Sequence, residues 1–394
     1  MKIVILTPTL YDEHSPFNHL FKDILEGWLD AGHEIVRIVA CTNENDEDYK
    51  MGISSGKISY IPVVRKRVEK SNIIVRYLKD TLTNMRMAKK IKSIKDADVL
   101  FEDVSYASFW SVSKAKKRGL KVVSMLQDVW PDNAVASNLI KDKGLIYKFF
   151  EFWQKKVYKK SDKIICISPD MKSFIATKGV PTDKIDIIYN WGYTDKTVNI
   201  AWEENEFVQK YDLRKEYFYA VYAGNIGKMQ NVELILRAAE LLKNNEKIRF
   251  LIVGDGVNRE QIEQTIKEKD LTNITILPMQ PSELATSVYS CAGVNLIPLV
   301  NGGIKTALPS KTGVVLSCGK PTVFCFGKDC AFSRTVENCC GVENVDCSSA
   351  TPLAEAIVKM SEECIDCAIG AQELFIKQFT RKENVKKYIA EIEF

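Results

Sequence analysis

Four segments of the chain carry side chains and glycines of the kinds that bind phosphate or move protons. The first is GNIGKMQN at residues 224–231, which lies between an apolar run and an amphipathic stretch. Glycines at such a turn let backbone N–H groups approach a phosphate, and a helix N-terminus favours negative charge. The pattern is not GxGxxG, so it predicts a phosphate site without a dinucleotide fingerprint. A tight strand-to-helix turn is the structural alternative.

The second segment is LPSKTG at residues 308–313. Ser310 is a good N-cap for a helix over 310–318, and Lys311 then falls in its first turn. A cation at that position opposes the helix dipole, and an anionic ligand at the same helix end would remove the penalty. We therefore expect Lys311 and the first-turn amides to bind a diphosphate, with a solvated lysine as the alternative.

The third segment, LQDVWPD at residues 126–132, follows an apolar run in the first half of the chain. Asp128 is placed there to contact a substrate hydroxyl or to act as a base, and Trp130 to stack on a sugar. Capping of the following turn is the alternative for Asp128. The fourth segment is the sharp GDG turn at 254–256, which follows the run FLIV and is a weaker signal of the same kind.

Alternating apolar runs and amphipathic stretches predict the elements that position these segments. In the first half, strands are expected at 2–7, 34–41, 98–101, 121–126, 163–168 and 185–189, with helices between them. After a polar stretch at 200–216 the pattern restarts, with strands at 218–223, 248–253, 273–277, 293–297 and 321–325. The alternation predicts an α/β fold of two doubly wound, Rossmann-like parallel sheets facing a cleft. Residues 1–190 would form the first domain, joined by terminal helices at 370–394, and residues 191–369 the second.

Composition limits the class of protein. Of the 394 residues, 46% are hydrophobic and 27% are charged, which is ordinary for a globular protein, and no run approaches a membrane span. The N-terminus MKIVILTPTL resembles a first strand rather than a signal peptide, so we expect a cytoplasmic protein. The 11 cysteines are odd in number, and we expect buried or free thiols. One CxxC and three histidines are a weak signal for zinc, so no metal is expected.

The charge is unevenly distributed. Residues 1–190 hold 32 basic and 24 acidic side chains, a net +8, whereas residues 191–394 hold 23 and 27, a net −4. The stretch 65–95 alone carries +9, which indicates a polyanionic partner, either nucleic acid or an anionic membrane, or else a solvated helix face. In the helix expected at 144–160, core spacing selects Ile146, Phe149, Phe150, Trp153 and Val157. Leu145 and Phe152 then fall beside the lysines, where they suit a membrane interface.

Taken in order, GHEIV, LQDVWPD, YAGNIGKMQN, FLIVGDG, LIPL and LPSKTGVVLSCGKPTVF resemble a GT-B glycosyltransferase of the family-4 type. The resemblance is to bacterial enzymes of O-antigen, capsule and colanic-acid assembly. It implies retaining transfer of a sugar from a nucleotide-diphosphate sugar, UDP- or GDP-linked, without a metal or other cofactor. It also implies a glycan acceptor, often lipid-linked, on the first domain at the inner face of the plasma membrane, and no nucleic acid.

The resemblance and the segments above define the expected site residues. Asp128 and Lys311 would be catalytic. The donor site would contain Gly224, Asn225, Gly227, Lys228, Gln230, Gly254, Asp255, Gly256, Met279, Gln280, Pro309, Ser310, Lys311 and Thr312, and the acceptor side Tyr11, His14 and Trp130. Thr306 and Val314 stand where many family-4 enzymes have a pair of glutamates, and Asn225 and Gln230 replace an arginine and a lysine. Lys228 and Lys311 would supply the missing positive charge.

Two other functions remain open at this point. A nucleotide-sugar 2-epimerase has the same architecture, but it needs acid and base residues in the cleft, commonly histidines. The three histidines all lie within the first 33 residues. A non-catalytic subunit that binds a nucleotide sugar or a partner enzyme is the second alternative, because sites are often lost on shared folds.

Overall fold

The computed structural model describes residues 1–7, 17–43, 48–50, 52–53, 56–65, 73–105, 107–363 and 368–394. Contacts divide the chain into two compact units. Unit 1 comprises residues 1–135, 140–189 and 384–394, and unit 2 comprises residues 136–139 and 190–383. The expected boundary at 190/191 lies one residue from this division. Of the terminal segment 370–394, only residues 384–394 belong to unit 1.

Unit 1 contains a seven-stranded parallel sheet in the order β3-β2-β1-β4-β5-β6-β7. The strands are β1 (Lys2–Thr7), β2 (Glu34–Cys41), β3 (Ile58–Val64), β4 (Val99–Asp103), β5 (Lys121–Leu126), β6 (Lys163–Cys166) and β7 (Ile185–Ile187). The inner strands are runs of β-branched and other apolar residues, such as KIVILT in β1, because helices cover both faces of a parallel sheet. The sheet order reverses at β1, between β2 and β4, which is where ligands bind in such folds.

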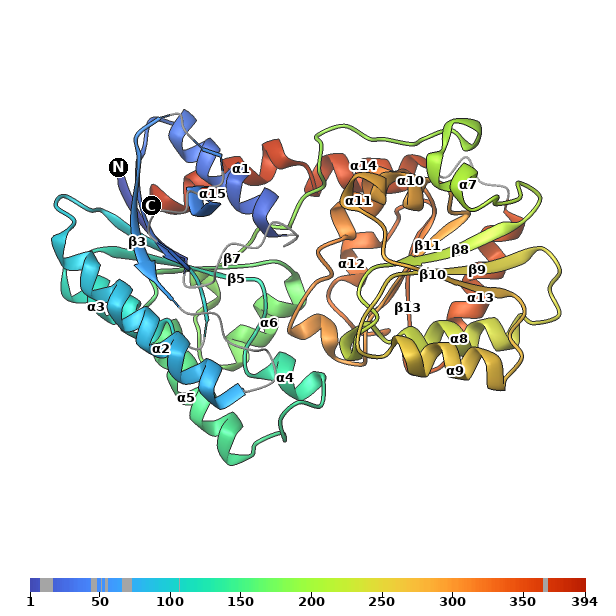
Figure 1. Cartoon of the computed structure of the whole chain (residues 1–394), viewed down its shortest axis with the longest axis horizontal. Coiled ribbons are helices and arrows are strands. Elements are labelled where there is room, and N and C mark those ends of the chain that lie inside the picture. Colours follow the sequence, from blue (N-terminus) through green and yellow to red (C-terminus); the bar gives the residue numbers. More distant parts are fainter. Residues whose placement is uncertain are drawn as a thin grey trace. The chain divides into compact units, whose positions relative to one another are not determined.

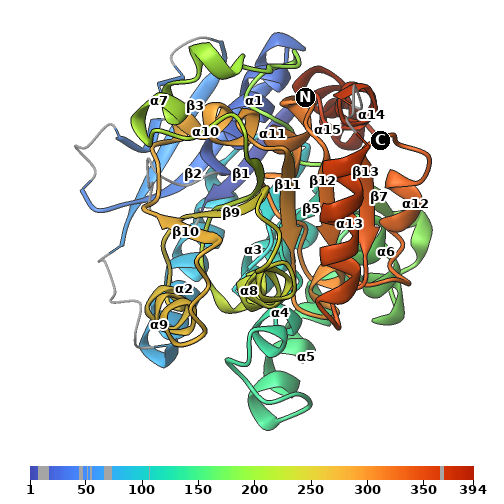
Figure 2. The same cartoon turned by 90° about the vertical axis from the view of Figure 1, so that its right-hand side faces the viewer.

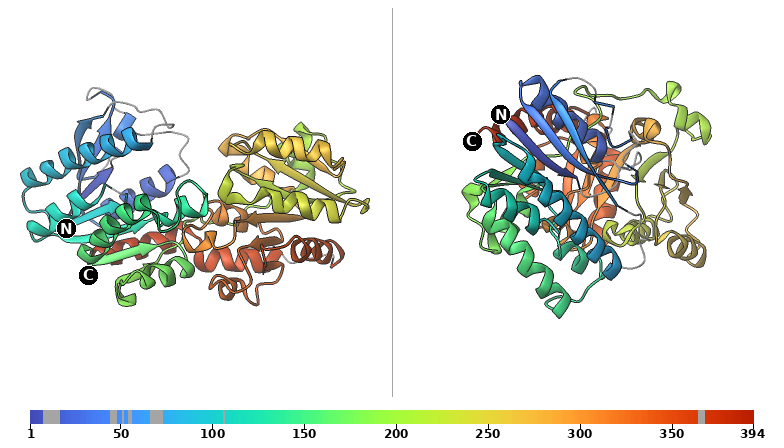
Figure 3. Two further views of the ribbon diagram at one scale, coloured as in Figure 1. Left: turned by 90° about the horizontal axis from the view of Figure 1, so that it is seen from below. Right: turned by 60° about the vertical axis from the view of Figure 1, so that its left-hand side comes forward.

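The helices of unit 1 come from both ends of the chain. They are α1 (Phe17–Asp30), α2 (Ile73–Lys90), α3 (Phe109–Lys117), α4 (Asp132–Ala136), α5 (Leu145–Lys160), α6 (Pro169–Thr177) and, from the far end of the chain, α15 (Arg381–Ile392). α2, α3 and α5 lie side by side (Figure 1; Figure 3, right). α15 packs on α1, where the Trp28 indole Nε1 donates a 3.2 Å hydrogen bond to the Tyr388 carbonyl. Gly27 permits this approach, since a Cβ there would lie 2.2 Å from Val385 Cγ1.

Unit 2 contains a six-stranded parallel sheet in the order β10-β9-β8-β11-β12-β13. Its strands are β8 (Phe218–Ala223), β9 (Ile248–Val253), β10 (Ile274–Leu277), β11 (Val294–Pro298), β12 (Thr322–Cys325) and β13 (Val342–Val345). The helices are α7 (Glu206–Lys210), α8 (Val232–Leu241), α9 (Arg259–Glu268), α10 (Ala285–Ser290), α11 (Thr312–Ser317), α12 (Ser333–Val336), α13 (Thr351–Glu362) and α14 (Ala368–Gln378). α8, α9 and α13 cover one face, and α10, α11 and α14 the other (Figures 1 and 2).

The fold class expected from the sequence, two Rossmann-like parallel-sheet units, is confirmed. Two expectations about side chains are wrong. On α5 the buried positions are Tyr147, Phe150, Gln154, Val157 and Tyr158, so the core face is rotated from the one expected. Ile146 and Phe149 are exposed instead, at 59% and 48%. Cys340 is disulfide-bonded, whereas eight other cysteines of the described residues are free thiols.

Candidate functional site

In unit 2, two glycine turns at the carboxyl ends of neighbouring strands lie against each other. The Ile226 amide N donates to the Asp255 carbonyl at 2.7 Å, and the Asn258 amide N donates to the Ile226 carbonyl at 3.0 Å. A Cβ on Gly254 would lie 1.9 Å from the Gly224 carbonyl oxygen, so only glycine fits there. The structure therefore brings the predicted segments 224–227 and 254–256 together at the carboxyl ends of β8 and β9, as a parallel sheet requires.

Lys311 reaches this pair of turns from a different part of the chain. Its ammonium Nζ donates a 2.7 Å hydrogen bond to the Ala223 carbonyl, and it lies 3.7 Å from the centroid of the Tyr222 ring. A Cβ on Gly224 would lie 3.2 Å from the same Nζ. Burial lowers the pKa of Lys311 to about 7, because the charged form loses its hydration. A cation thus stands at the end of β8 beside the glycine turns.

The expected position of Lys311 within the first turn of its helix is wrong. α11 begins at Thr312, and the N-cap position is Lys311 itself, without a side-chain capping bond. Ser310 is exposed and lies one residue before the N-cap. The Thr312 hydroxyl donates to the Pro309 carbonyl at 2.7 Å across the turn that leads into the helix. Lys311 is therefore held by β8 rather than by the dipole of its own helix.

Of the other expected donor residues in 224–231, Asn225 and Gly227 precede a short 3-10 turn, Lys228–Gln230, which lies before α8. Lys228 begins this turn and is exposed, and Asn231 ends it in the left-handed conformation at φ 46°. The Asn225 side-chain amide Nδ2 lies 3.4 Å from Gln230 Oε1, and a Cβ on Gly227 would meet both side chains within 3 Å. Lys228 therefore lies next to the glycine turns. It is not part of α8, which starts at Val232.

Met279 and Gln280 follow β10, the next strand along. Met279 is half-exposed, and the Gln280 amide is engaged with α7, 2.8 Å from the Tyr211 hydroxyl and 2.9 Å from Lys210 Nζ. Arg259, which sequence reasoning did not single out, connects this loop to the glycine turns. Its guanidinium donates to the carbonyls of Gly254 and Leu277. The sequence signal that could have identified Arg259 is a basic residue shortly after a GDG turn, at the start of the next helix.

In unit 1, carboxyl groups gather at the ends of β4 and β5. Asp103 is the last residue of β4 and pairs in register with Met125, and Asp128 follows closely after Leu126, where β5 ends. Burial and repulsion from Asp128 raise the pKa of Asp103 to about 7. Desolvation by the surrounding protein also raises the pKa of Asp128, although part of the residue's surface is exposed to solvent.

Asp103 and its neighbour Glu102 were not among the residues expected from the sequence, since the strand was expected to end at residue 101. Glu102 is fully buried and accepts a 3.3 Å hydrogen bond from the Asn84 side-chain amide of α2. Burial raises the pKa of Glu102 to about 7, against hydrogen bonds from Ser111, Ser108 and Asn84 that lower it. Two acidic residues directly after the apolar run VLF were the signal for this site.

The expected acceptor residues have different outcomes. Trp130, two residues before α4, lies against Phe150 of α5, with ring centroids 5.3 Å apart, so it packs on that helix. Asp132, the second carboxylate of LQDVWPD, is used structurally: Lys178 Nζ is 2.7 Å from it and the Tyr147 hydroxyl 2.8 Å. Tyr11 and His14 lie outside the described residues.

The positions where family-4 enzymes often have two glutamates are closed to solvent. Thr306 is 4% exposed, and its hydroxyl donates to the Gly303 carbonyl at 3.0 Å. Val314 is 6% exposed and is part of α11. Within the described residues, no three His, Cys, Asp or Glu side chains are grouped as metal ligands would be.

Comparison with known proteins agrees with this arrangement. Residues 18–195 match the family model Glycosyltransferase Family 4, and residues 203–310 match Glycosyl transferases group 1. The class defined by the fold and the site is GT-B, two Rossmann-like units with the glycine turns on the second. Together the two matches extend over most of the chain, and the chain belongs to the family-4 type of GT-B glycosyltransferases.

Individual relatives are distant. The probable glycosyltransferase WbjE of Pseudomonas aeruginosa is 24% identical over 219 residues, which are 56% of this chain and 54% of the relative. The putative colanic acid biosynthesis glycosyl transferase WcaI of Escherichia coli is 25% identical over 208 residues, 52% of this chain and 51% of the relative. The matches thus span about half the length of these curated relatives. A solved structure of Anabaena HepE in complex with UDP covers 100% of both chains with a TM-score of 0.71 and 13% identity, which shows the shared fold.

Proposed function

We propose that this protein is a retaining glycosyltransferase that moves a sugar from a nucleotide-diphosphate sugar to a glycan acceptor in the assembly of a surface polysaccharide. The observation that carries the proposal is the Lys311 ammonium beside the paired glycine turns of unit 2. The family assignment and the polysaccharide role named for WcaI support it. The UDP bound to HepE supports a nucleotide donor, UDP- or GDP-linked.

In the proposed reaction, the bond between the anomeric carbon and the β-phosphate oxygen breaks, and negative charge builds on the departing diphosphate. Lys311 and Lys228 would neutralise that charge, together with backbone N–H groups of residues 225–231 other than those of Ile226 and Gln230, which already donate to carbonyls, because fixed donors and cations stabilise charge that develops in the transition state. No metal or other cofactor is assigned in this proposal. A partly buried lysine near neutral pKa suits this task, since a phosphate would stabilise the ammonium that desolvation destabilises.

We propose that the acceptor binds to unit 1 at the ends of β4 and β5. The acceptor hydroxyl oxygen forms the new bond to the anomeric carbon on the face that the phosphate leaves. Its proton goes to the Asp128 carboxylate or to the leaving phosphate. Asp103 would act on Asp128, because two neighbouring carboxyls of raised pKa hold a proton between them more readily than either alone.

We also propose that unit 1 binds an anionic membrane surface and thereby approaches a lipid-linked acceptor. Seven exposed apolar residues support this: Leu78 and Leu82 of α2, Trp110 of α3, and Leu145, Ile146, Phe149 and Phe152 of α5. Five lysines of α5 flank them: Lys148, Lys155, Lys156, Lys159 and Lys160. Phe152 is 53% exposed, and its ring contacts Trp153 and the Lys156 ammonium of its own helix. Within the described residues, no helix combines the length and apolar character that crossing a bilayer demands.

The test uses a panel of nucleoside diphosphates and nucleotide sugars in a thermal-shift assay, because a ligand that binds the folded state raises the melting temperature. The donor that stabilises the protein is then incubated with it, with and without a lipid-linked glycan primer. We expect transfer only with the primer. Conversion of the donor alone to an epimeric sugar would establish the 2-epimerase alternative. Binding without turnover on any primer would instead establish a non-catalytic subunit, for which the closed positions of Thr306 and Val314 are the favouring observation.

A further inference from the structure

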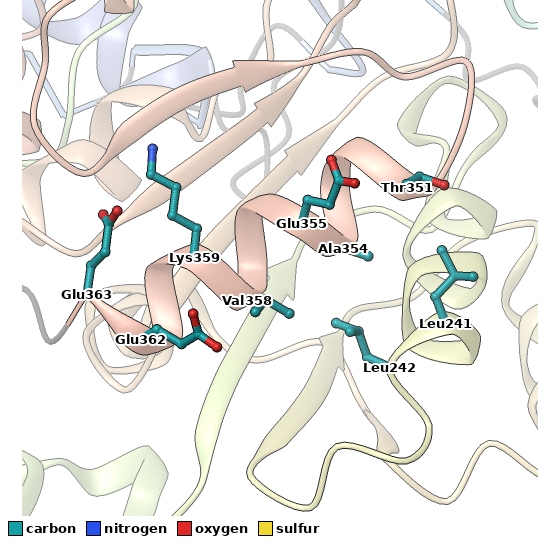
Figure 4. A pocket seen from close by; sticks show the side chains of 9 residues that line it. All are labelled: Leu241, Leu242, Thr351, Ala354, Glu355, Val358, Lys359, Glu362 and Glu363. Atoms are coloured by element: carbon teal, nitrogen blue, oxygen red, sulfur yellow. The ribbon is translucent and has the colours of Figure 1, made fainter.

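Unit 2 has a groove that the proposed reaction does not use. It lies between α13 and the C-terminal end of α8, with a volume of about 540 Å³ (Figure 4). Its apolar lining is formed by Leu241, Leu242, Ala354 and Val358. Leu241 is 57% exposed, so a large apolar side chain on this surface lacks cover. α8 begins at Val232 beside the donor turns, and at 1.5 Å per residue Leu241 lies about 13 Å further along the helix.

The rim of this groove is acidic. Glu355 and Glu362 of α13, and Glu363 directly after its last residue, belong to the lining of the groove (Figure 4). The one cation of the groove, Lys359, forms a salt bridge with Glu343. None of the ion pairs among the described residues includes Glu355 or Glu362. These carboxylates therefore present net negative charge to whatever approaches the groove.

The acidic surface continues beyond the groove. A second cavity of about 760 Å³ shares Lys359 and Glu363 with it, and its lining adds Glu337, Glu343 and Arg334. The two linings together hold five carboxylates and two cations, a net charge of −3. An apolar strip with an acidic edge along α13 is the complement of an amphipathic helix with a basic polar face.

We propose that this groove is the docking site for a basic amphipathic helix of a protein partner. Apolar residues at i, i+3, i+4 and i+7 of that helix would cover Leu241, Leu242 and Val358. Its lysines and arginines would face Glu355 and Glu362, which have no ion-pair partner among the residues that the structure describes. Docking at the far end of α8 leaves the glycine turns open, so the partner binds without competing with a nucleotide.

The test measures fluorescence anisotropy of a labelled synthetic helix with leucine at i, i+3, i+4 and i+7 and lysine at the other positions, titrated with the full chain. We expect saturable binding that weakens about tenfold with Leu241→Asp, and also with Glu355→Lys combined with Glu362→Lys. A peptide with glutamate in place of lysine should not bind. Leu145→Asp and Glu206→Lys make the same kinds of change on exposed sites of α5 and α7 and should leave the affinity unchanged.

Because Leu241, Glu355 and Glu362 are not core residues, the variants should melt as the parent does, and loss of binding then reports the groove. Equal binding by parent and groove variants would overturn the proposal. So would absence of saturable binding. Self-association of the parent that the same groove variants abolish would also overturn it, and would assign the groove to a second copy of this chain. The readout does not depend on sugar transfer, so it stands apart from the proposed activity.

Discussion

The Lys311 ammonium is 2.7 Å from the carbonyl oxygen of Ala223, the last residue of β8. No ion pair among the described residues includes Lys311, and a carbonyl and the Tyr222 ring are its contacts. These neutral groups do not replace the water that the ammonium loses, which is why its pKa falls. A diphosphate at the glycine turns would supply the missing anion, so Lys311 should control both the strength and the pH dependence of nucleotide binding.

Replacing Lys311 by alanine should weaken binding of the nucleoside diphosphate by roughly tenfold or more, since charge-assisted hydrogen bonds contribute about 1.5–3 kcal/mol. Isothermal titration of the parent and variant with the diphosphate measures the change. Lys305→Ala, at an exposed lysine six residues earlier, is the matched control and should bind as the parent does. If Lys311→Ala binds as tightly as the parent, Lys311 does not contact the phosphates and serves only to hold α11 against β8.

Nucleotide affinity should also fall as the pH rises above about 7, where the free protein loses the Lys311 proton. Binding an anion favours the charged ammonium, so the complex takes up a proton that the free protein lacks at that pH. The decrease should approach tenfold per pH unit until the bound lysine also titrates. Lys311→Arg keeps its charge throughout and should remove this dependence. A parent whose affinity falls no more steeply than that of the arginine variant would contradict the prediction.

Asp128→Asn should lower kcat by two or more orders of magnitude while the dissociation constant of the donor changes little, because Asp128 belongs to unit 1 and the glycine turns to unit 2. Initial rates with a saturating donor, together with donor titration, separate the two quantities. The matched control, Asp142→Asn, changes an exposed carboxylate on the loop before α5 and should retain parental rates. If Asp128→Asn weakens donor binding as much as it lowers kcat, the Asp128 carboxyl belongs to the donor site.

The sequence predicts the fold better than the site because the two depend on different information. Strands such as KIVILT and FYAVYA are apolar throughout most of their length. Their limits at 2–7 and 218–223 can be predicted because polar residues flank the apolar runs. β3 was not expected, since it contains Pro62 and lies at the sheet edge with most of its residues only partly buried. β13 was also not expected, because only one of its four residues is buried.

Site residues are harder to predict because they meet through tertiary contacts. Glycines at the ends of β8 and β9 are local signals and were recognised. The contact of Lys311 with Ala223 joins residues 88 apart in the sequence, so no spacing rule shows it. Asp103 was overlooked for the same reason, since its significance lies in its neighbour Asp128, which follows the adjacent strand.

Glu102→Gln should make the stability of unit 1 less dependent on pH. The parent carboxyl has a pKa of about 7 in the folded chain and 4.5 as its reference value, so the unfolded chain loses its proton first. Folding stability therefore falls as the pH rises from about 4.5 to about 7, by roughly 3 kcal/mol for this shift. Glutamine keeps the acceptor for Asn84 without the charge. Melting temperatures should thus be higher for the variant than for the parent at pH 8 and similar at pH 4.5.

Asp103 has a pKa raised in the same direction and should leave a remaining pH dependence of the same sign in Glu102→Gln. The double variant that combines Glu102→Gln with Asp103→Asn should show a still weaker dependence of stability on pH. The melting temperatures of the parent and of the Gln variant are each compared at pH 5 and pH 8. If both change by the same amount, Glu102 is ionised in the folded chain without cost to stability, and the prediction is wrong.

The exposed face of α5 should bind anionic membranes. Leu145 and Phe152 are 88% and 53% exposed beside lysines, and near an anionic leaflet each basic residue adds about 1 kcal/mol to binding. The parent should therefore co-sediment with anionic vesicles at low salt, less at high salt, and poorly with neutral vesicles. Leu145→Glu combined with Phe152→Glu should abolish this binding, because it removes apolar contact and adds repulsion. Leu241→Glu changes an exposed leucine of unit 2 and should bind as the parent does. Absence of the parent from anionic vesicles even at low salt would exclude the membrane proposal and favour a soluble acceptor.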